Sequence, residues 1–171
     1  MTPCIALALV LTGAAVSSVA LAQTCNPRIR LSQPSDRYVV NAAQGTVLDI
    51  QTGLIWKRCA EGLSGGDCDR GIARTLNWSH ALRQSVGSSY AGYKDWRVPN
   101  LKELKSLVEV ACVGPAINAA MFPNTPADWT WSSSPNAYHV GGSWSVSFHS
   151  GYSESHNRGN GFVVRLVRGG Q

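Results

Sequence analysis

The segment 129–168, WTWSSSPNAYHVGGSWSVSFHSGYSESHNRGNGFVVRLVR, constrains the fold most, because large apolar residues occupy every second position in two of its parts. In SWSVSFHS, Trp144, Val146 and Phe148 share one side, and polar residues occupy the other. GFVVRLVR places Phe162 and Leu166 on one side in the same way. Alternation of this kind is typical of half-buried strands. We therefore predict two strands that pair antiparallel through the GYSESHNRGN connection.

Helical spacing is found in the segment 77–86, NWSHALRQSV. Its larger apolar residues recur three or four positions apart, as they would on one buried helical face. Gly87 follows directly and is a candidate for the C-cap. The predicted buried face consists of Trp78, Ala81, Leu82 and Val86.

A second helix is predicted to follow Asn100, in LKELKSLVEV. Asn100 and Glu103 have the spacing of a capping box, in which each side chain accepts a hydrogen bond from the backbone N–H of the other residue. Lys102, Lys105 and Glu109 lie off the apolar stripe, and we expect them to face solvent. The predicted buried stripe consists of Leu101, Leu104, Leu107, Val108 and Ala111.

Short strands are also predicted nearer the N-terminus, over residues 37–40, 47–50 and 54–57, with Thr52-Gly53 as a turn. Together these segments indicate an α+β fold in which two helices pack on a small, mostly antiparallel sheet. The length fits one domain over residues 23–171.

Residues 1–22 form an apolar segment that ends on Ala20-Leu21-Ala22, the small-residue pattern that a signal peptidase accepts. We predict a signal peptide and cleavage before Gln23. The alternative is a retained membrane anchor, but Gly13 interrupts the apolar run, which is shorter than a typical span of about 20 residues. No later segment approaches spanning length, so the protein is expected to be periplasmic or secreted.

Four cysteines follow the predicted signal peptide, an even number in an oxidising compartment, which favours two disulfides. Cys59 and Cys68 flank a short Gly-rich loop that closes easily, so we pair them and leave Cys25 to Cys112. The alternative is a zinc site, which is disfavoured because the chain has no C-x-x-C pair.

The chain carries a formal net charge of +5, and most of its basic residues are arginines. These residues are scattered, and no Lys/Arg run of the kind found in nucleic-acid-binding tails is present, so a nucleic-acid partner is not expected. Arginine recognises carboxylates and sulfates with two parallel hydrogen bonds. An acidic or sulfated polysaccharide is therefore a candidate partner, and ordinary surface solvation is the alternative.

Six blocks of sequence resemble one protein family when taken in order: DIQTGLIWKRC, WSHAL, GYKDWRVPNLKELKSLVE, FPNTPADWTWSSS, SVSFHSG and VVRLVRGG. They are similar to the Lcl C-terminal domain family of exported bacterial domains. This resemblance implies a C-type lectin-like fold and a binding function, because the named member of the family looks like an adhesin whose terminal domain binds sulfated glycans.

The best candidates for a recognition surface are aromatic and polar residues between the predicted strands, because loops held by a rigid sheet commonly bind ligands. Trp131 and Trp144 either stack on a ligand or pack inward, as does Trp129. Protonation of the histidines below about pH 6.5 would strengthen binding of an anion. The candidate binding residues are Trp131, Tyr138, His139, Trp144, His149, Tyr152, Glu154, His156, Asn157 and Arg158.

Other conspicuous residues are assigned structural roles. Trp56, Trp78 and Trp96 lie in strand, helix and pre-helix contexts, where burial is the better interpretation. Asp95 and Arg97 either clamp a ligand or pair with each other or with the backbone to fix the loop before the second helix. We favour the structural alternative for both.

No catalytic, metal or cofactor site is predicted. The sequence lacks G-x-S-x-G, H-E-x-x-H and P-loop motifs, and its carboxylates are too dispersed to nominate a glycosidase pair. The nearest match to the calcium-binding Glu-Pro-Asn loop of C-type lectins is Ser134-Pro135-Asn136, which lacks the carboxylate. The sequence thus favours a noncatalytic module that binds a surface glycan. The alternative is an interaction or structural protein of the envelope that binds another protein and no glycan.

Overall fold

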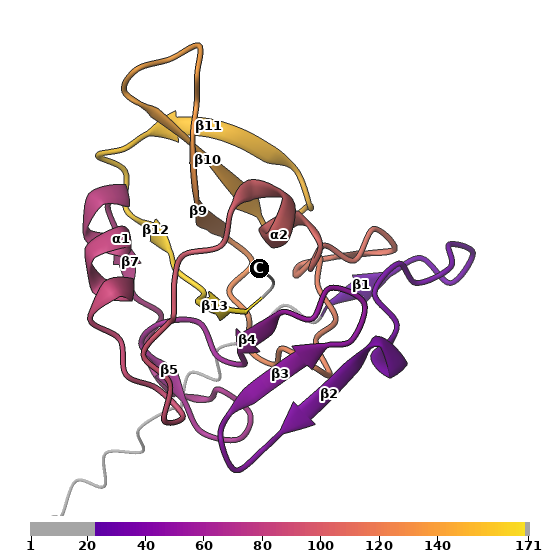
Figure 1. Cartoon of the computed structure of the whole chain (residues 1–171). Helices are drawn as coiled ribbons and strands as arrows, with labels where there is room; N and C mark the ends of the chain where they lie inside the picture. Colours follow the sequence, from indigo (N-terminus) through magenta and orange to yellow (C-terminus); the bar gives the residue numbers. More distant parts are fainter. Residues whose placement is uncertain (1–22, 170–171) are drawn as a thin grey trace, which may run out of the picture.

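The computed structural model describes residues 23–169, which form two main sheets and two short helices joined by long connections (Figure 1). The predicted signal peptide, residues 1–22, lies outside the described residues. No helix in the described part of the chain is long and apolar enough to cross a membrane.

The first sheet has the strand order β13-β4-β3-β2, and all its pairings are antiparallel. The three N-terminal strand predictions are confirmed with ends shifted by one residue. The turn at Thr52-Gly53 is also confirmed, since Gly53 has a φ of 70° and donates its N–H to Asp49 O at 2.8 Å. The strands are β2 (Tyr38–Asn41), β3 (Thr46–Asp49), β4 (Ile55–Lys57) and β13 (Val167–Arg168).

The second sheet has the order β11-β10-β9-β12-β7 and is antiparallel except for the pair β12–β9. The predicted pairing of 143–150 with 161–168 is wrong. Strand β10 pairs instead with β11, which lies inside the predicted connection, and 161–168 divides into β12 and β13 in different sheets. The strands are β7 (Thr75–Leu76), β9 (Trp129–Pro135), β10 (Gly142–Ser147), β11 (Ser153–Asn157) and β12 (Phe162–Val163).

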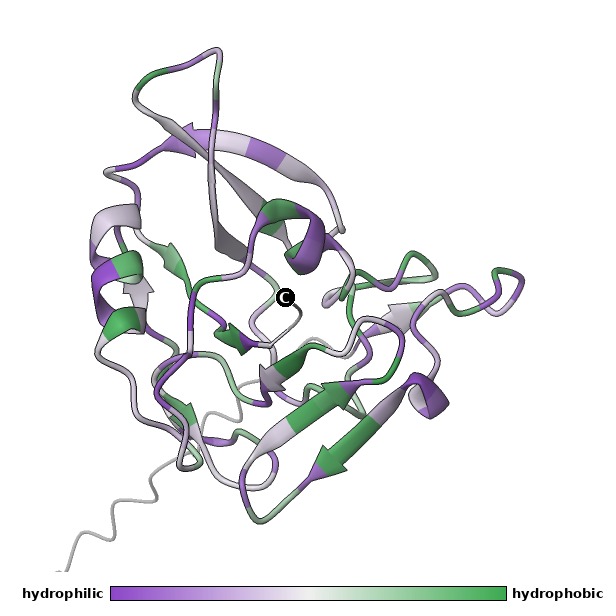
Figure 2. Ribbon diagram, in the orientation of Figure 1, coloured by the Kyte–Doolittle hydropathy of each residue, from purple (hydrophilic) through white to green (hydrophobic). Residues whose placement is uncertain are grey.

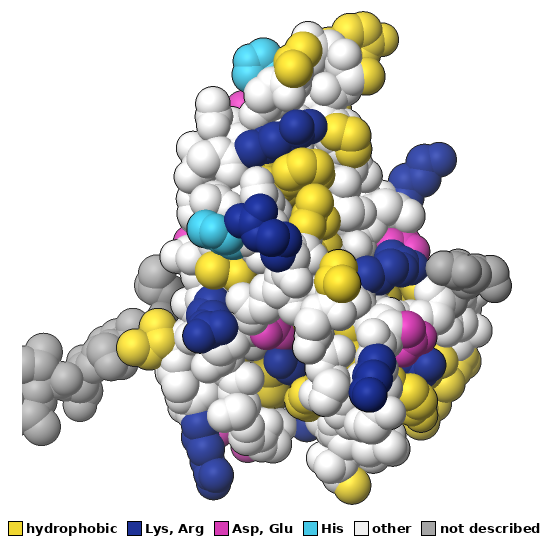
Figure 3. All heavy atoms as spheres, turned by 60° about the vertical axis from the view of Figure 1, so that its left-hand side comes forward, with side chains coloured by type: hydrophobic (Ala, Val, Ile, Leu, Met, Phe, Trp, Pro, Cys, Tyr) yellow, Lys and Arg dark blue, Asp and Glu magenta, His cyan; other side chains and the backbone are white. Residues whose placement is uncertain are grey.

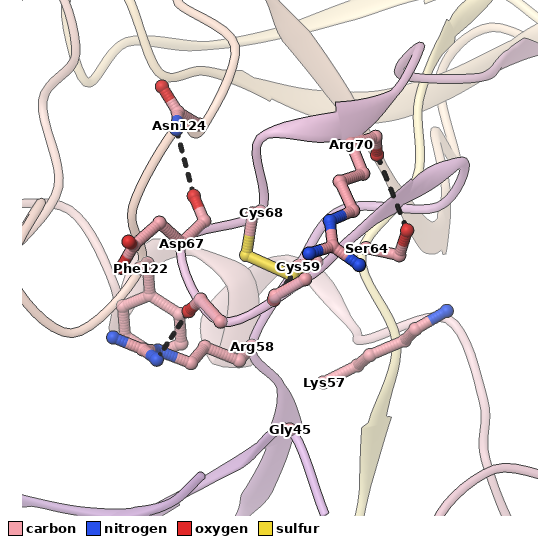
Figure 4. Close-up of a disulfide and its surroundings, with 12 residues drawn as sticks. Gly45, Lys57, Arg58, Cys59, Ser64, Asp67, Cys68, Arg70, Phe122 and Asn124 are labelled. Atoms are coloured by element: carbon pink, nitrogen blue, oxygen red, sulfur yellow. Dashed lines mark hydrogen bonds between the residues drawn. A yellow bond between two sulfur atoms is a disulfide. The ribbon is translucent and has the colours of Figure 1, made fainter.

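Both disulfides form as predicted. Cys25–Cys112 joins the short antiparallel pair β1 (Thr24–Cys25) and β8 (Cys112–Val113), so it ties the N-terminal arm to the segment after the second helix. Cys59–Cys68 closes the loop that contains β5 (Leu63–Ser64), which pairs with β6 (Arg70–Gly71) (Figure 4). Asn124 donates its side-chain N–H to Asp67 O of this loop at 2.8 Å.

Helix α1 (Trp78–Val86) begins after Asn77, whose side chain accepts the N–H of His80 at 2.9 Å. The helix ends at Gly87, as predicted. Its buried face includes Ala81, but Val86 is 82 % exposed, so the prediction that Val86 belongs to that face is wrong.

Helix α2 (Leu101–Lys105) has the predicted capping box between Asn100 and Glu103 but is shorter than predicted. The apolar stripe beyond it is still buried, because the chain turns and carries Leu107 and Val108 into the core. Glu109 was expected to face solvent and is instead 2 % exposed. Its carboxylate accepts hydrogen bonds from backbone N–H groups of the N-terminal arm, which the periodicity of its own segment does not reveal.

The core consists of two apolar clusters. One lies beneath α2 and joins Leu104 to Trp56 of β4 and to Phe148, which directly follows β10. The other lies beneath α1 and contains Trp96 and Trp131. Figure 2 shows that the hydrophobic residues of α1 alternate with hydrophilic ones around the helix, as expected when one side faces the sheet.

Candidate functional site

One face of the five-stranded sheet carries aromatic and hydroxyl side chains of the segment 129–168. In the strand register, Ser145 of β10 pairs with Trp131 of the neighbouring strand β9 and with Glu154 of the neighbouring strand β11. Ser143 is likewise opposite His156. Because directly paired residues project to the same side of a sheet, these side chains share one face. Helix α1 covers only the part of this face around Trp131.

The rest of this face is a partly buried group of rings beside α1. The His156 ring meets Trp129 at a centroid distance of 4.4 Å and Phe162 at 4.9 Å, both edge to face. Trp129 and Phe162 stack at 6.2 Å. We call Trp78, Trp129, His156, Arg158 and Phe162 the aromatic face. Figure 3, which turns the α1 side forward, shows hydrophobic and basic side chains next to each other on this side.

Arg158 is held in place at the edge of the aromatic face. Its guanidinium lies 4.3 Å from the centre of the Trp78 ring, and its Nε donates to Ser143 Oγ at 2.8 Å. Neither terminal amino group donates a hydrogen bond to any of the residues 23–169. The stacked, oriented guanidinium can therefore offer two parallel N–H donors to a carboxylate or sulfate.

Ser145, His156 and Glu154 form a chain of polar contacts that resembles a hydrolase triad in composition. Ser145 Oγ is 2.9 Å from His156 Nδ1, and Glu154 lies 3.9 Å from His156 Nε2. However, Ser145 is 0 % exposed, and its hydroxyl also donates to Glu154 O at 3.1 Å. A nucleophile must reach the substrate carbon, so this buried hydroxyl serves to hold the imidazole in position.

The predicted binding residues separate into two groups at opposite ends of the β10–β11 hairpin. Tyr138 and His139 lie in the loop before β10, close to Asn157 and Arg158, because Arg158 N donates to Gly141 O at 3.0 Å. His149 and Tyr152 lie in the loop at the other end. The three candidate histidines do not lie together: His139 and His149 are at different ends of the hairpin, and His156 is packed among rings.

Two of the predicted tryptophans do not belong to an open surface. Trp131 is 0 % exposed and donates its indole N–H to Leu76 O at 2.8 Å, so its assignment as a ligand-binding residue is wrong. Trp144 is half-buried on the opposite side of the sheet from Ser143 and Ser145, toward α2. The predicted polar side of β10 is also buried: Ser143 accepts a hydrogen bond from Arg158, and Ser145 contacts His156.

Sequence reasoning missed Trp78 and Phe162 as surface aromatics. Both were assigned to buried faces, and both are only half-buried. Trp129 was left undecided and lies at the centre of the uncovered rings. The alternation of Trp129 with Trp131 signals that the two share a face, but only the position of α1 decides which one is covered.

Asp95 and Arg97 have structural roles, as favoured, but not with each other. Arg97 makes two hydrogen bonds of 2.7 Å to the Glu103 carboxylate, and Asp95 accepts from Arg168 Nε at 2.8 Å. Burial raises the pKa of Glu103, but the hydrogen bonds from Arg97 and the backbone of Asn100 outweigh this effect and lower it. These contacts fix the loop between α1 and α2. No cluster of three or more His, Cys, Asp or Glu side chains suited to a metal ion occurs within residues 23–169.

A family model, the Lcl C-terminal domain, matches residues 45–168. The chain belongs to the Lcl C-terminal domain family. The matched residues include both helices, most of the two sheets and the whole aromatic face, so the site described above lies within the Lcl domain. The N-terminal arm and β2 precede it. A search of curated proteins finds no match.

Proposed function

We propose that this Lcl domain protein is an exported, noncatalytic binding module that recognises an anionic glycan of a cell surface or extracellular matrix through the aromatic face. The observation that carries the proposal is the position of Arg158. Its guanidinium is already stacked and oriented in the free protein, so little side-chain freedom is lost when an anion binds.

The rings beside Arg158 suit the rest of a sugar ligand. Trp129 and Phe162 are only partly buried, and a pyranose ring can lie on an apolar ring face while its hydroxyls stay in water. The proposal includes the C-type lectin-like fold implied by the family resemblance. The mixed architecture, mostly antiparallel sheets and two disulfides support this assignment.

Export is part of the same proposal. Two disulfides are characteristic of proteins that fold in an oxidising compartment, and the Lcl family is one of exported domains. We propose a periplasmic or secreted location.

The experiment is binding of the oxidised protein to an array of sulfated, uronic-acid and neutral polysaccharides at low and high ionic strength. We expect binding to sulfated or uronic-acid chains that weakens at high salt, because the ion pair with Arg158 is screened. Arg158→Gln should weaken binding at least tenfold. The matched control is Arg83→Gln, which removes the same charge from an exposed position on α1. Equal weakening in both variants, or binding to neutral chains alone, would contradict the proposal.

A second candidate function is contact with an envelope protein. The observation that favours it is the loop between β9 and β10, which projects from the sheet (Figure 1) and carries Tyr138 at 99 % and Val140 at 91 % exposure. A contact made by these apolar side chains would be insensitive to salt. Loss of a co-purified envelope partner in Tyr138→Ser, with glycan binding absent in the wild type, would favour this candidate over the first.

A further inference from the structure

A second surface lies on the N-terminal arm, away from the aromatic face. The arm, residues 26–31, projects as a loop beside the segment that follows α2, on the right-hand side of Figure 1. In Figure 2 that neighbouring segment, residues 110–113, is coloured mainly hydrophobic. The arm precedes the residues matched by the Lcl family model, so it is a feature of this chain beyond the family domain.

The arm is anchored at both ends. At one end Cys25 is bonded to Cys112, and Asn26 N donates to Ala111 O at 2.8 Å. At the other end the Glu109 carboxylate accepts the N–H groups of Ser32 at 3.0 Å and Gln33 at 2.8 Å. The loop therefore keeps a defined position while its tip stays in solvent.

The tip and the adjacent segment expose apolar side chains that the described chain covers only in part. In the arm, Ile29 is 44 % exposed and Leu31 is 49 % exposed. In the adjacent segment, Val110 is 65 % and Val113 is 47 % exposed. Contiguous apolar groups on an exposed projection are typical of a contact with a partner or a membrane.

The same loop is cationic. Arg28 and Arg30 alternate with the apolar residues and are exposed, and neither side chain makes a hydrogen bond or ion pair with the described residues. From Thr24 to Ser35 the chain has no acidic residue. The only acidic residue between 108 and 117 is Glu109, whose carboxylate is buried against the arm.

We propose that this projection binds the surface of an anionic lipid bilayer. The two arginines pair with anionic headgroups, while Ile29, Leu31 and Val110 enter the boundary between headgroups and acyl chains. A bilayer fits the observations better than a protein pocket does, because the arm projects from the fold (Figure 1), and headgroups rearrange around a projection whereas a folded partner needs a matching hollow. The charge excludes a purely apolar partner.

The experiment is co-sedimentation of the protein with vesicles, after export with its own leader and a mass measurement showing that the leader has been removed. Vesicles of phosphatidylglycerol and phosphatidylethanolamine are compared with vesicles of phosphatidylcholine. We expect binding to the anionic vesicles only. The variant Ile29→Ser with Leu31→Ser should raise the lipid concentration for half-binding at least tenfold. The control is Ile72→Ser with Val86→Ser, which removes exposed apolar surface elsewhere.

A second pair of variants tests the charges. Arg28→Gln with Arg30→Gln should weaken binding by about thirtyfold, since each cation near an anionic surface contributes about 1 kcal/mol. The control, Arg74→Gln with Arg83→Gln, has the same net charge and should bind like the wild type. Unchanged urea midpoints would show that all variants are folded. The proposal is overturned if the wild type does not bind anionic vesicles, if it binds phosphatidylcholine equally, or if the arm variants and their controls lose binding to the same extent.

Discussion

The buried carboxylate of Glu109 gives the sharpest test of how the arm is held. Oε1 accepts the N–H groups of Ser32 at 3.0 Å and Ala111 at 2.9 Å, and Oε2 accepts the N–H of Gln33 at 2.8 Å. In Glu109→Gln the amide oxygen can keep the first two bonds, but the amide nitrogen meets the N–H of Gln33. One buried donor is then unpaired and the remaining bonds are no longer charge-assisted, so we expect a loss of about 2–4 kcal/mol in the free energy of unfolding.

The effect should depend on pH with a defined sign. Burial raises the pKa of Glu109, but hydrogen bonds from the backbone of Ala111, Ser32 and Gln33 outweigh this effect and lower it. A carboxyl group whose pKa is lower in the folded state contributes stability above its unfolded pKa, and this contribution is lost as the pH falls through the folded pKa. The difference between wild type and Glu109→Gln should therefore be largest near neutral pH and should narrow in acid.

The assay is urea denaturation followed by tryptophan fluorescence at about pH 7 and about pH 3, with both disulfides oxidised. Glu154→Gln is the control. The Glu154 side chain is 67 % exposed, so this substitution should change the free energy of unfolding by less than about 0.5 kcal/mol. The reasoning is refuted if Glu109→Gln behaves like this control at pH 7, or if its deficit is the same at both pH values.

Two further predictions concern the disulfides and the core. The Cys25–Cys112 disulfide links residues 87 positions apart, and replacing both cysteines by serine should lower the free energy of unfolding by about 4–5 kcal/mol. The Cys59–Cys68 disulfide links residues 9 positions apart, and the same replacement there should lower it by about 2–3 kcal/mol. Equal losses in urea denaturation would contradict the ranking by loop length. Trp131→Ala leaves a cavity in the core and should lower the free energy of unfolding by about 3–5 kcal/mol. Tyr138→Ala in the exposed loop should change it by less than about 0.5 kcal/mol. A large loss for Tyr138→Ala would show that the loop is packed.

Local signals in the sequence predicted local structure well. Asn100 caps the second helix, Gly87 ends the first, and Gly53 forms the predicted turn, because these features depend on a few neighbouring residues and their backbone hydrogen bonds. The disulfide pairing was also predicted, since a short loop between Cys59 and Cys68 favours closure and leaves one partner for Cys25.

Predictions that depended on distant segments failed. The segment 161–168 has a strand-like pattern, but its two ends pair in different sheets, with β7 and β9 at one end and β4 at the other. Glu109 lies off the apolar stripe of its own segment, yet it is buried because the arm brings its N–H groups to the carboxylate. Alternation along one strand indicates which residues share a face of the sheet. It does not indicate which other segment covers that face.

The candidate site was predicted only in part. Arg158 and His156 were identified because they stand out in a polar segment between two apolar ones. Trp78 was not identified, because its helical spacing indicates burial. Its contact with Arg158 forms because the end of β11 lies next to α1. The chemistry of the aromatic face therefore comes from three segments that the sequence separates by about half its length.

The most direct test of glycan recognition at the aromatic face is a titration of the isotopically labelled protein with a sulfated heparin tetrasaccharide, followed through the tryptophan indole N–H resonances. We expect the signals of Trp78 and Trp129 to shift on binding, while those of the buried Trp56 and Trp96 stay unchanged. No shift at saturating tetrasaccharide, or shifts that leave Trp78 and Trp129 unaffected, would contradict the proposed recognition.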